Sequence, residues 1–358
     1  MGGGAGLALP ADIRIATPRT MYAMPEQRIG FSPDFGGSYF MNQLDGQIGT
    51  WLALTGRDVF GREAFELGIA SHYVAEEAVP ELKARLSKLD SPTADEISTI
   101  VSEYHVPASE GLASKQNPNG STPIKGEIRA FLDRTFSLPS LSAIYKALKE
   151  EEVSGSPQVR AWAAEQRKMM DTRGPTGMAV AVENYHSAGK AKRYATTVEQ
   201  DSLMCTGFTG GFRATNDLIV GAVHSLFDKK KTPIPFDPPI TDLDNPFLQP
   251  EAIKANFFRR DSPYLVDCPP KDVGDGLHPR PKEKVGPDAN WGKFRRYGVP
   301  SEEMVKGAVG EGASPDEVVS SLVWKEKGAR RDELEAVVRR ILKEHTTGAP
   351  HGLVKWMV

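Results

Sequence analysis

The sequence predicts an α/β fold in its first part, followed by an all-helical region and a C-terminal extension. Three observations support this division: short apolar runs separated by glycines over residues 1–90, helical periodicity over residues 91–231, and a proline-rich change of composition at residue 232. With 358 residues, the chain can form one large core, or one core with a smaller appended region.

The first 90 residues combine strand-like and helix-like patterns. Residues 11–16 alternate in the manner of a strand, and residues 71–74 predict a second short strand. Residues 36–54 and 62–67 carry helical patterns. The glycines that separate these helical runs are Gly46, Gly56 and Gly61. This mixture of short strands and helices is typical of α/β proteins.

Residues 91–231 are predicted to be helical throughout. A capping residue or an N-terminal proline marks each predicted helix start, at Ser91, Ser137, Ser156 and Pro175. We therefore expect about five consecutive helices in this region.

The extension over residues 232–358 begins where helical continuation is impossible, because four prolines fall within residues 233–239. Helical patterning returns near the end, with a predicted start at Ser314. An apolar stripe at helical spacing follows, formed by Leu334, Val337, Val338, Ile341 and Leu342. We expect terminal helices in this part of the chain.

Composition excludes few classes of function. The net charge of −3 and the charged fraction of 25% show no basic excess that would demand nucleic acid. Cys205 and Cys268 have no metal-ligand spacing and are too few for a disulfide framework, which favours a reducing compartment and predicts no metal site. No apolar run approaches the roughly 18 residues of a membrane-spanning helix, so we expect no membrane partner.

The glycine run at residues 2–6 lacks the spacing of a phosphate-binding loop. It allows close approach of backbone, so its N–H groups could stabilise a developing oxyanion; a simple tight turn is the alternative.

Two carboxylates follow prolines inside apolar stretches, Glu26 after Pro25 and Asp34 after Pro33. Apolar surroundings raise the pKa of a carboxylate, which suits general acid or base catalysis. For Asp34, a turn or helix cap is the alternative.

Together, the motifs MGGGAGL at residues 1–7, Pro-Glu at 25–26, Pro-Asp at 33–34 and LALTG at 52–56 resemble the 3-hydroxyisobutyryl-CoA hydrolases of the crotonase superfamily. The resemblance is strong over residues 1–76 and traceable to about residue 231. It implies a crotonase-like ββα spiral core.

By this resemblance, the N–H of Gly3 is one donor to the thioester oxyanion, Glu26 is the catalytic carboxylate, and Asp34 contacts the hydroxyacyl end of the substrate. Whether Glu26 attacks the thioester or activates water stays open.

The resemblance also implies a function: hydrolysis of a short hydroxyacyl-CoA thioester in valine catabolism, in the mitochondrial matrix. Coenzyme A would enter only as part of the substrate, with no other cofactor. On this basis, residues 1–90 would be the C-terminal part of the core, residues 91–231 a helical region covering the active site, and residues 232–358 an extension. We expect the N-terminal part of the core and a mitochondrial leader to precede Met1 in a longer protein.

The extension contains a stretch, residues 290–298, in which aromatic and cationic side chains alternate. The candidate RNA contacts are Trp291, Lys293, Arg295 and Arg296. The alternative is that the cationic stems lie over aromatic rings within the protein.

Fungal mitochondrial small ribosomal subunits contain a constituent that is similar to these hydrolases. This second resemblance implies an alternative function as a structural component, contacting ribosomal RNA and neighbouring proteins through the extension, whether or not it is active as an enzyme. A catalytically inactive scaffold that binds other proteins is a further alternative.

Overall fold

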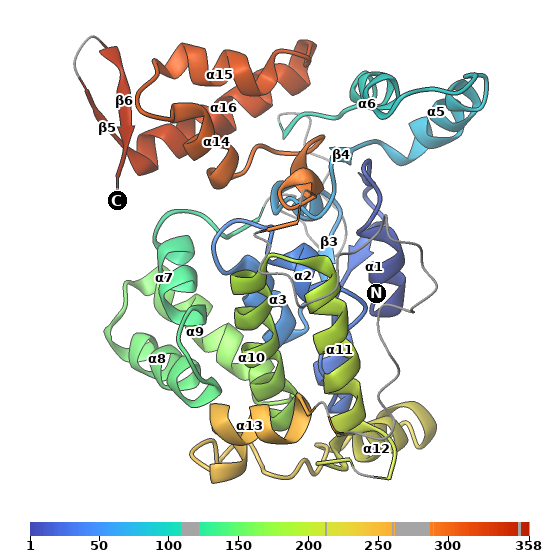
Figure 1. The fold of residues 1–358 in the computed structure, drawn as a ribbon, viewed down its shortest axis with the longest axis vertical. Coiled ribbons are helices and arrows are strands. Elements are labelled where there is room, and N and C mark those ends of the chain that lie inside the picture. The colour runs from blue at the N-terminus through green and yellow to red at the C-terminus, as the bar shows by residue number, and fades with distance from the viewer. Residues whose placement is uncertain are drawn as a thin grey trace. The chain divides into compact units, whose positions relative to one another are not determined.

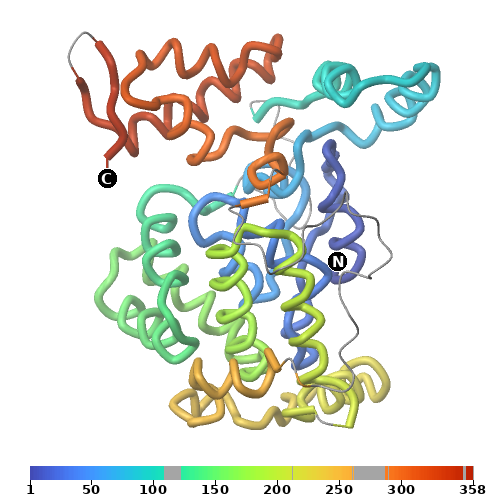
Figure 2. The backbone as a smooth tube through the Cα atoms, viewed as in Figure 1, coloured from blue at the N-terminus to red at the C-terminus, as the bar shows by residue number. Residues whose placement is uncertain are grey.

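The computed structural model describes residues 1–108, 122–211, 213–259, 261, 287–288, 290–349 and 352–357, and Cys268 lies outside them. The chain forms two compact units, and each unit draws on three stretches of sequence. The first unit contains Met1–Ala8, Ala23–Asp58 and Pro123–Trp291; the second contains Leu9–Tyr22, Val59–Thr122 and Gly292–Val358. Figure 2 traces this path along the chain.

The first unit begins with short elements that carry the candidate site residues. They are α1 (Gly3–Ala8), the 3-10 helix η1 (Pro25–Ile29), α2 (Gly37–Met41) and α3 (Ile48–Thr55). Gly46, with φ +53°, lies in the turn between α2 and α3, so the predicted break at this glycine is confirmed.

The remaining helices of the first unit form its larger part. They are α7 (Gly126–Phe136), α8 (Leu141–Ser154), α9 (Pro157–Met170), α10 (Pro175–Ala191), α11 (Tyr194–Phe208), α12 (Asp217–Ala222), the π-helical turn η4 (Val223–Phe227), η5 (Pro246–Leu248) and α13 (Pro250–Phe257). Prolines at the start of α9 and α10 confirm two predicted helix starts.

Helix α10 forms the centre of the first unit and contacts α2, α3, α8, α11 and α13 (Figure 1). Most of its side chains are buried, which is typical of a helix surrounded by others. Gly177 is required there, because a Cβ at this position would lie 2.4 Å from the carbonyl oxygen of Phe31. The helix therefore packs directly against the segment that leads to Asp34.

The second unit holds all six described strands, none longer than three residues. Strand β1 (Ile15–Ala16) pairs in parallel with β4 (His72–Tyr73), β2 (Met21–Tyr22) pairs antiparallel with β3 (Val59–Phe60), and β5 (Thr346–Gly348) pairs antiparallel with β6 (Val354–Trp356). The strands predicted at 11–16 and 71–74 are thus present, but shorter than predicted. Each described strand pairs with only one other strand, and the described part of the chain is mostly helical.

The helices of the second unit fall between β3 and β5 in the sequence. They are α4 (Arg62–Glu66), η2 (Glu76–Ala78), α5 (Val79–Leu86), α6 (Ala94–Ser102), η6 (Lys293–Arg295), α14 (Glu302–Val309), α15 (Pro315–Val323) and α16 (Gly328–His345). A capping box at Ser314 and Glu317 starts α15, which confirms the predicted start.

Two buried arginines connect the strands of the second unit to the C-terminal extension. Arg14 donates to the carbonyl oxygens of Ile69 at 2.7 Å and Phe294 at 2.6 Å. Arg330 donates to those of Ser71 at 3.2 Å and Tyr297 at 2.7 Å. These four carbonyl oxygens lie outside the strands, in the segment before β4 and in or after η6, and the guanidinium groups satisfy them.

Candidate active site

A glycine turn at the start of the chain forms one wall of the site. Gly2 adopts φ +52°, and its N–H donates to the carbonyl oxygen of Ala23 at 3.2 Å. Gly3 begins helix α1; the next N–H groups, of Gly4 and Ala5, donate to the carbonyl oxygens of Met1 and Gly2, whereas that of Gly3 has no acceptor among the described residues. The backbone around Gly3 can therefore offer a hydrogen bond to an incoming anionic oxygen.

Glu26 lies directly against this turn. Pro25 and Glu26 open the 3-10 helix η1, and a Cβ placed on Gly2 would lie 3.1 Å from Glu26 Oε1. Only 8% of Glu26 is exposed, and its Oε2 has no hydrogen-bond partner among the described residues. Burial, with a smaller contribution from the nearby charge of Asp34, raises the pKa of Glu26 to about 7.

Asp34 follows Pro33 and is half-buried. Its Oδ2 lies 3.7 Å from the thiol sulfur of Cys205, the donor, on helix α11. Burial raises the pKa of Asp34 to about 6, although the thiol contact opposes this shift. Gly3, Glu26 and Asp34 come from three separate sequence motifs, and the structure brings them together in the first unit.

The backbone after Asp34 takes an unusual conformation. Phe35 has φ +53° and Gly36 has φ +74°, so two consecutive residues lie in the left-handed region. For a bulky residue such as phenylalanine this conformation is strained and persists only when surrounding contacts enforce it. The side chain of Phe35 is 61% exposed and its ring faces Gly3, since a Cβ there would lie 3.6 Å from the ring.

Asp201 supplies the enforcing contact. Its Oδ2 accepts a hydrogen bond from the N–H of Gly36 at 2.8 Å, and its Oδ1 accepts one from Asn184 Nδ2 at 2.9 Å. The hydroxyl of Ser38 donates to Oδ1 at 3.4 Å. Burial raises the pKa of this carboxyl group to about 7.

The sequence interpretation missed Asp201. One signal was available: Thr197, Asp201, Met204 and Phe208 follow each other at spacings of one helical turn and are all buried. An acidic residue inside such a stripe indicates a buried polar contact.

This arrangement can support acid–base or nucleophilic chemistry near neutral pH. Two carboxyl groups with raised pKa values lie beside a turn whose N–H can bind an oxyanion, so one group can be ionised while the other holds a proton. Among the described residues, no group of three or more His, Cys, Asp or Glu side chains could hold a metal ion.

The predicted RNA contacts fall in different surroundings. Trp291 belongs to the first unit, where its ring packs edge-on against Tyr39 with centroids 5.4 Å apart and Lys192 lies 5.4 Å from it. Arg295 is only 3% exposed and donates to the carbonyl oxygen of Val299 at 2.9 Å. Lys293 and Arg296 are exposed. The alternative interpretation, cationic stems over rings, describes Trp291 better, and Arg295 is committed to a backbone carbonyl inside the protein.

No helix in the described ranges is both long and apolar enough to cross a membrane.

The matches to known proteins differ in how much of the chain they cover. A model of the enoyl-CoA hydratase/isomerase family matches residues 1–245. The small ribosomal subunit protein mS47 of Neurospora crassa is 30% identical over 99% of this chain and 66% of its own length. The mitochondrial 3-hydroxyisobutyryl-CoA hydrolase of Mus musculus is 33% identical over 65% of this chain and 56% of its own length. The chain thus spans less than two thirds of either relative.

Among solved structures, a carnitinyl-CoA dehydratase from Mycobacterium thermoresistibile superposes with a TM-score of 0.55 and 25% identity, covering 74% of this chain and 67% of that one. An enoyl-CoA hydratase from Rhodobacter sphaeroides superposes with a TM-score of 0.52 and 24% identity, covering 72% and 65%. These superpositions show that this chain shares the crotonase fold.

Proposed function

Because this chain belongs to the enoyl-CoA hydratase/isomerase family, and because its similarity to one relative runs through the whole C-terminal extension, we propose that it is a constituent of the mitochondrial small ribosomal subunit built on a crotonase fold. Its partners would be ribosomal RNA and neighbouring ribosomal proteins. The hydrolase relatives are mitochondrial proteins, which supports this location.

The extent of similarity carries the proposal. The family model ends at residue 245 and the mouse hydrolase matches 65% of the chain, whereas the Neurospora ribosomal protein matches 99%. A metabolic enzyme of the family needs no such extension for its chemistry, whereas a protein within a large assembly needs contact surface. The extension therefore favours the ribosomal function over a purely metabolic one.

Sedimentation of the full chain with mitochondrial subunits tests this proposal. Affinity-tagged protein expressed in mitochondria should sediment with the small subunit, and it should stay there when magnesium is lowered enough to separate the two subunits. A mitochondrial 3-hydroxyisobutyryl-CoA hydrolase carrying the same tag is the matched control and should remain at the top of the gradient. Equal profiles for the two proteins would refute the ribosomal function.

A second function, thioester hydrolysis, is favoured by one observation, the pairing of Glu26 with the Gly2–Gly3 turn and Asp34. In this proposal, the ionised Glu26 attacks the carbonyl carbon of a 3-hydroxyacyl-CoA thioester or removes a proton from the attacking water. The Gly3 N–H binds the resulting oxyanion, and the coenzyme A thiolate leaves as the carbonyl re-forms. Asp34, whose pKa of about 6 leaves it ionised when Glu26 is ionised, holds the 3-hydroxyl group or relays a proton from water to that thiolate. Where Glu26 attacks, water then hydrolyses the mixed anhydride and frees the Glu26 carboxylate; where Glu26 activates water, the free acid forms directly.

Release of coenzyme A from 3-hydroxyisobutyryl-CoA, followed by a thiol-reactive dye, tests this second function. Glu26→Gln keeps the shape of the side chain and removes its charge, so it should abolish release above the uncatalysed rate. Equal rates for the two proteins would exclude Glu26 from the reaction. The result bears only on hydrolysis and leaves the sedimentation test unaffected.

A further inference from the structure

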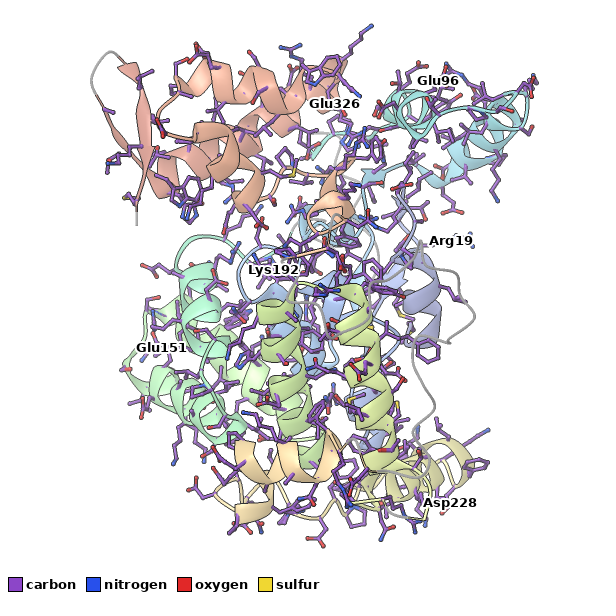
Figure 3. The ribbon with its side chains drawn as sticks, in the orientation of Figure 1. Arg19, Glu96, Glu151, Lys192, Asp228 and Glu326 are labelled. Atoms are coloured by element: carbon purple, nitrogen blue, oxygen red, sulfur yellow. The ribbon has the colours of Figure 1, made fainter. Side chains whose placement is uncertain are left out.

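A cavity of about 380 Å³ lies in the second unit between helix α6 and the segment that joins α15 to α16. Its lining includes Asp95, Arg296, Tyr297, Trp324, Lys325 and Lys327. In Figure 3, Glu326 marks the junction of α15 and α16, and Glu96 marks α6. None of these groups takes part in the candidate active site, which belongs to the first unit.

Trp324 is the notable member of this lining, because 67% of it is exposed. Trp51 and Trp162, by contrast, are 0% and 5% exposed. Leaving an indole in water forgoes the large stabilisation that its burial would give. The ammonium group of Lys325 lies over the indole, 4.9 Å from the ring centroid. The exposed indole is therefore a flat apolar platform with a positive charge beside it.

The acidic groups around the cavity are already compensated. Asp95 accepts from Lys325 at 2.5 Å, from Arg296 at 3.3 Å and from Tyr297 at 2.8 Å. These contacts, led by Lys325, lower its pKa and keep it ionised. Its single negative charge is thus shared by two cations.

The other two acids of the lining also have cationic partners. Glu103 pairs with Arg85 at 2.5 Å, and Glu326 pairs with Arg330 at 3.5 Å. The exposed Lys327 adds a further positive charge at the rim. The lining itself thus holds three cations and three acids. Because each acid has a cationic partner, two of them in Arg85 and Arg330 outside the lining, the exposed Lys327 is left to pair with an anion.

We propose that this surface, made of Trp324, Lys325, Lys327, Arg296 and Tyr297 and called here the Trp324 surface, binds single-stranded RNA. A base stacks on the indole, and the phosphates on either side pair with Lys327 and Arg296. An acidic peptide would leave the exposed indole without a stacking partner, whereas a nucleotide base stacks on it. In a double helix the faces of the bases are covered by neighbouring bases, so a single strand fits this surface better. A lipid surface would require several exposed apolar side chains. This inference rests on the proposed ribosomal function for the source of the RNA.

Fluorescence anisotropy of a labelled oligoadenylate of about ten nucleotides, titrated with the full chain, tests the inference. Wild-type protein should bind, with an affinity that falls as salt rises. Trp324→Ala should weaken binding by about tenfold, as expected when a base loses its stacking partner, while Trp324→Phe should keep most of the affinity. Lys327→Glu should weaken binding and reduce the salt dependence by roughly one phosphate contact.

Phe227→Ala is the matched control. Phe227 is 76% exposed and precedes the lysine run at 229–231, but it belongs to the first unit. Its replacement should leave binding unchanged if the placement at Trp324 is correct. Circular dichroism and thermal unfolding of each variant verify that the fold is intact.

Three outcomes would overturn the inference: no binding by wild-type protein, equal binding by wild type and Trp324→Ala, or displacement of the RNA by poly-glutamate at the same total charge. Failure of the ribosomal function is distinguishable. If the chain binds RNA through Trp324 but does not sediment with small subunits, the RNA-binding inference holds and the ribosomal function is refuted. If the chain sediments with small subunits while Trp324→Ala binds RNA normally, the ribosomal function holds and the RNA-binding inference is refuted.

Discussion

Asp201 accepts a 2.8 Å hydrogen bond from the backbone N–H of Gly36, and so ties helix α11 to the strained segment that carries Asp34. The carboxyl group is buried and also accepts from Asn184 and Ser38. A single side chain thus holds the candidate acid, the exposed ring of Phe35 and the start of helix α2 in one arrangement.

Replacing Asp201 should destabilise the protein. In Asp201→Asn, the amide nitrogen must face a donor, because both carboxylate oxygens accept hydrogen bonds in the native protein. We expect the free energy of unfolding to fall by about 1 to 3 kcal/mol in urea denaturation, the cost of a buried polar group without a partner. Asp228→Asn, at an exposed ion pair with Lys230, is the control and should change stability little. Equal effects would contradict the role of Asp201.

The raised pKa of Glu26 makes stability depend on pH. Its pKa is 4.5 ordinarily and about 7 in the folded protein, so between these values the folded state binds more protons than the unfolded state. The free energy of unfolding should therefore fall as pH rises through this window. Glu26→Gln should be more stable than wild type at about pH 8, by on the order of 2 kcal/mol, and nearly equal at about pH 4.5.

Urea denaturation of both proteins across this pH range measures the effect. Asp34 and Asp201 also have raised pKa values and will keep part of the slope in the variant. Parallel curves for wild type and Glu26→Gln would show that Glu26 titrates at its ordinary pKa in the folded protein.

Helix α1 offers a paired test of the contact with Phe35. A Cβ at Gly6 would lie 2.5 Å from the Cβ of Phe35, whereas one at Gly4 would meet nothing within 4 Å. Gly6→Ala should displace Phe35 and lower stability by about 1 to 3 kcal/mol. Gly4→Ala should be neutral or raise stability by about 0.5 kcal/mol, since alanine restricts the unfolded chain. Thermal unfolding compares them, and similar midpoints would show that Phe35 does not occupy this position.

Arg330 should tolerate no substitution, including lysine. Its guanidinium donates to Ser71 and Tyr297 carbonyl oxygens and to the hydroxyl of Ser102, and a single ammonium cannot reach all three. We expect Arg330→Lys to lower the free energy of unfolding by about 2 to 4 kcal/mol. Arg331→Lys, at the exposed neighbouring position, should have little effect. Chemical denaturation of the two variants distinguishes a hydrogen-bond network centred on Arg330 from a general effect of replacing arginine by lysine.

Much of the fold followed from local sequence patterns. The helix starts at Ser156, Pro175 and Ser314 and the break at Gly46 are confirmed, because caps, prolines and glycines act within a few residues. The strands were predicted too long, since strand length depends on partners elsewhere in the chain, and each described strand pairs with only one other strand.

The family was also accessible from sequence, because the Gly-rich turn and the two proline-set carboxylates lie at characteristic spacing; the match over residues 1–245 confirms it. The roles of Gly3, Glu26 and Asp34, and the division at residues 90 and 231, stay predictions. The hydrogen bonding of Asp201 could not be predicted, because its partner Gly36 is 165 residues away. The surface at Trp324 could not be predicted either, because a Trp-Lys-Glu-Lys stretch has the same pattern as an ordinary solvated helix end.

The buried guanidinium groups of Arg14 and Arg330 bear on how such an extension persists over evolutionary time. Their hydrogen bonds to the carbonyl oxygens of Phe294 and Tyr297 make the extension part of the interior of its own unit. A lineage that lost the extension would remove the Phe294 acceptor of the buried Arg14 and the Arg330 donor to the carbonyl oxygen of Ser71, and the fold itself would suffer. Selection for foldability alone would then retain the added segment, even in a descendant whose partner had disappeared. Entrenchment of this kind can outlast the interaction that first favoured it.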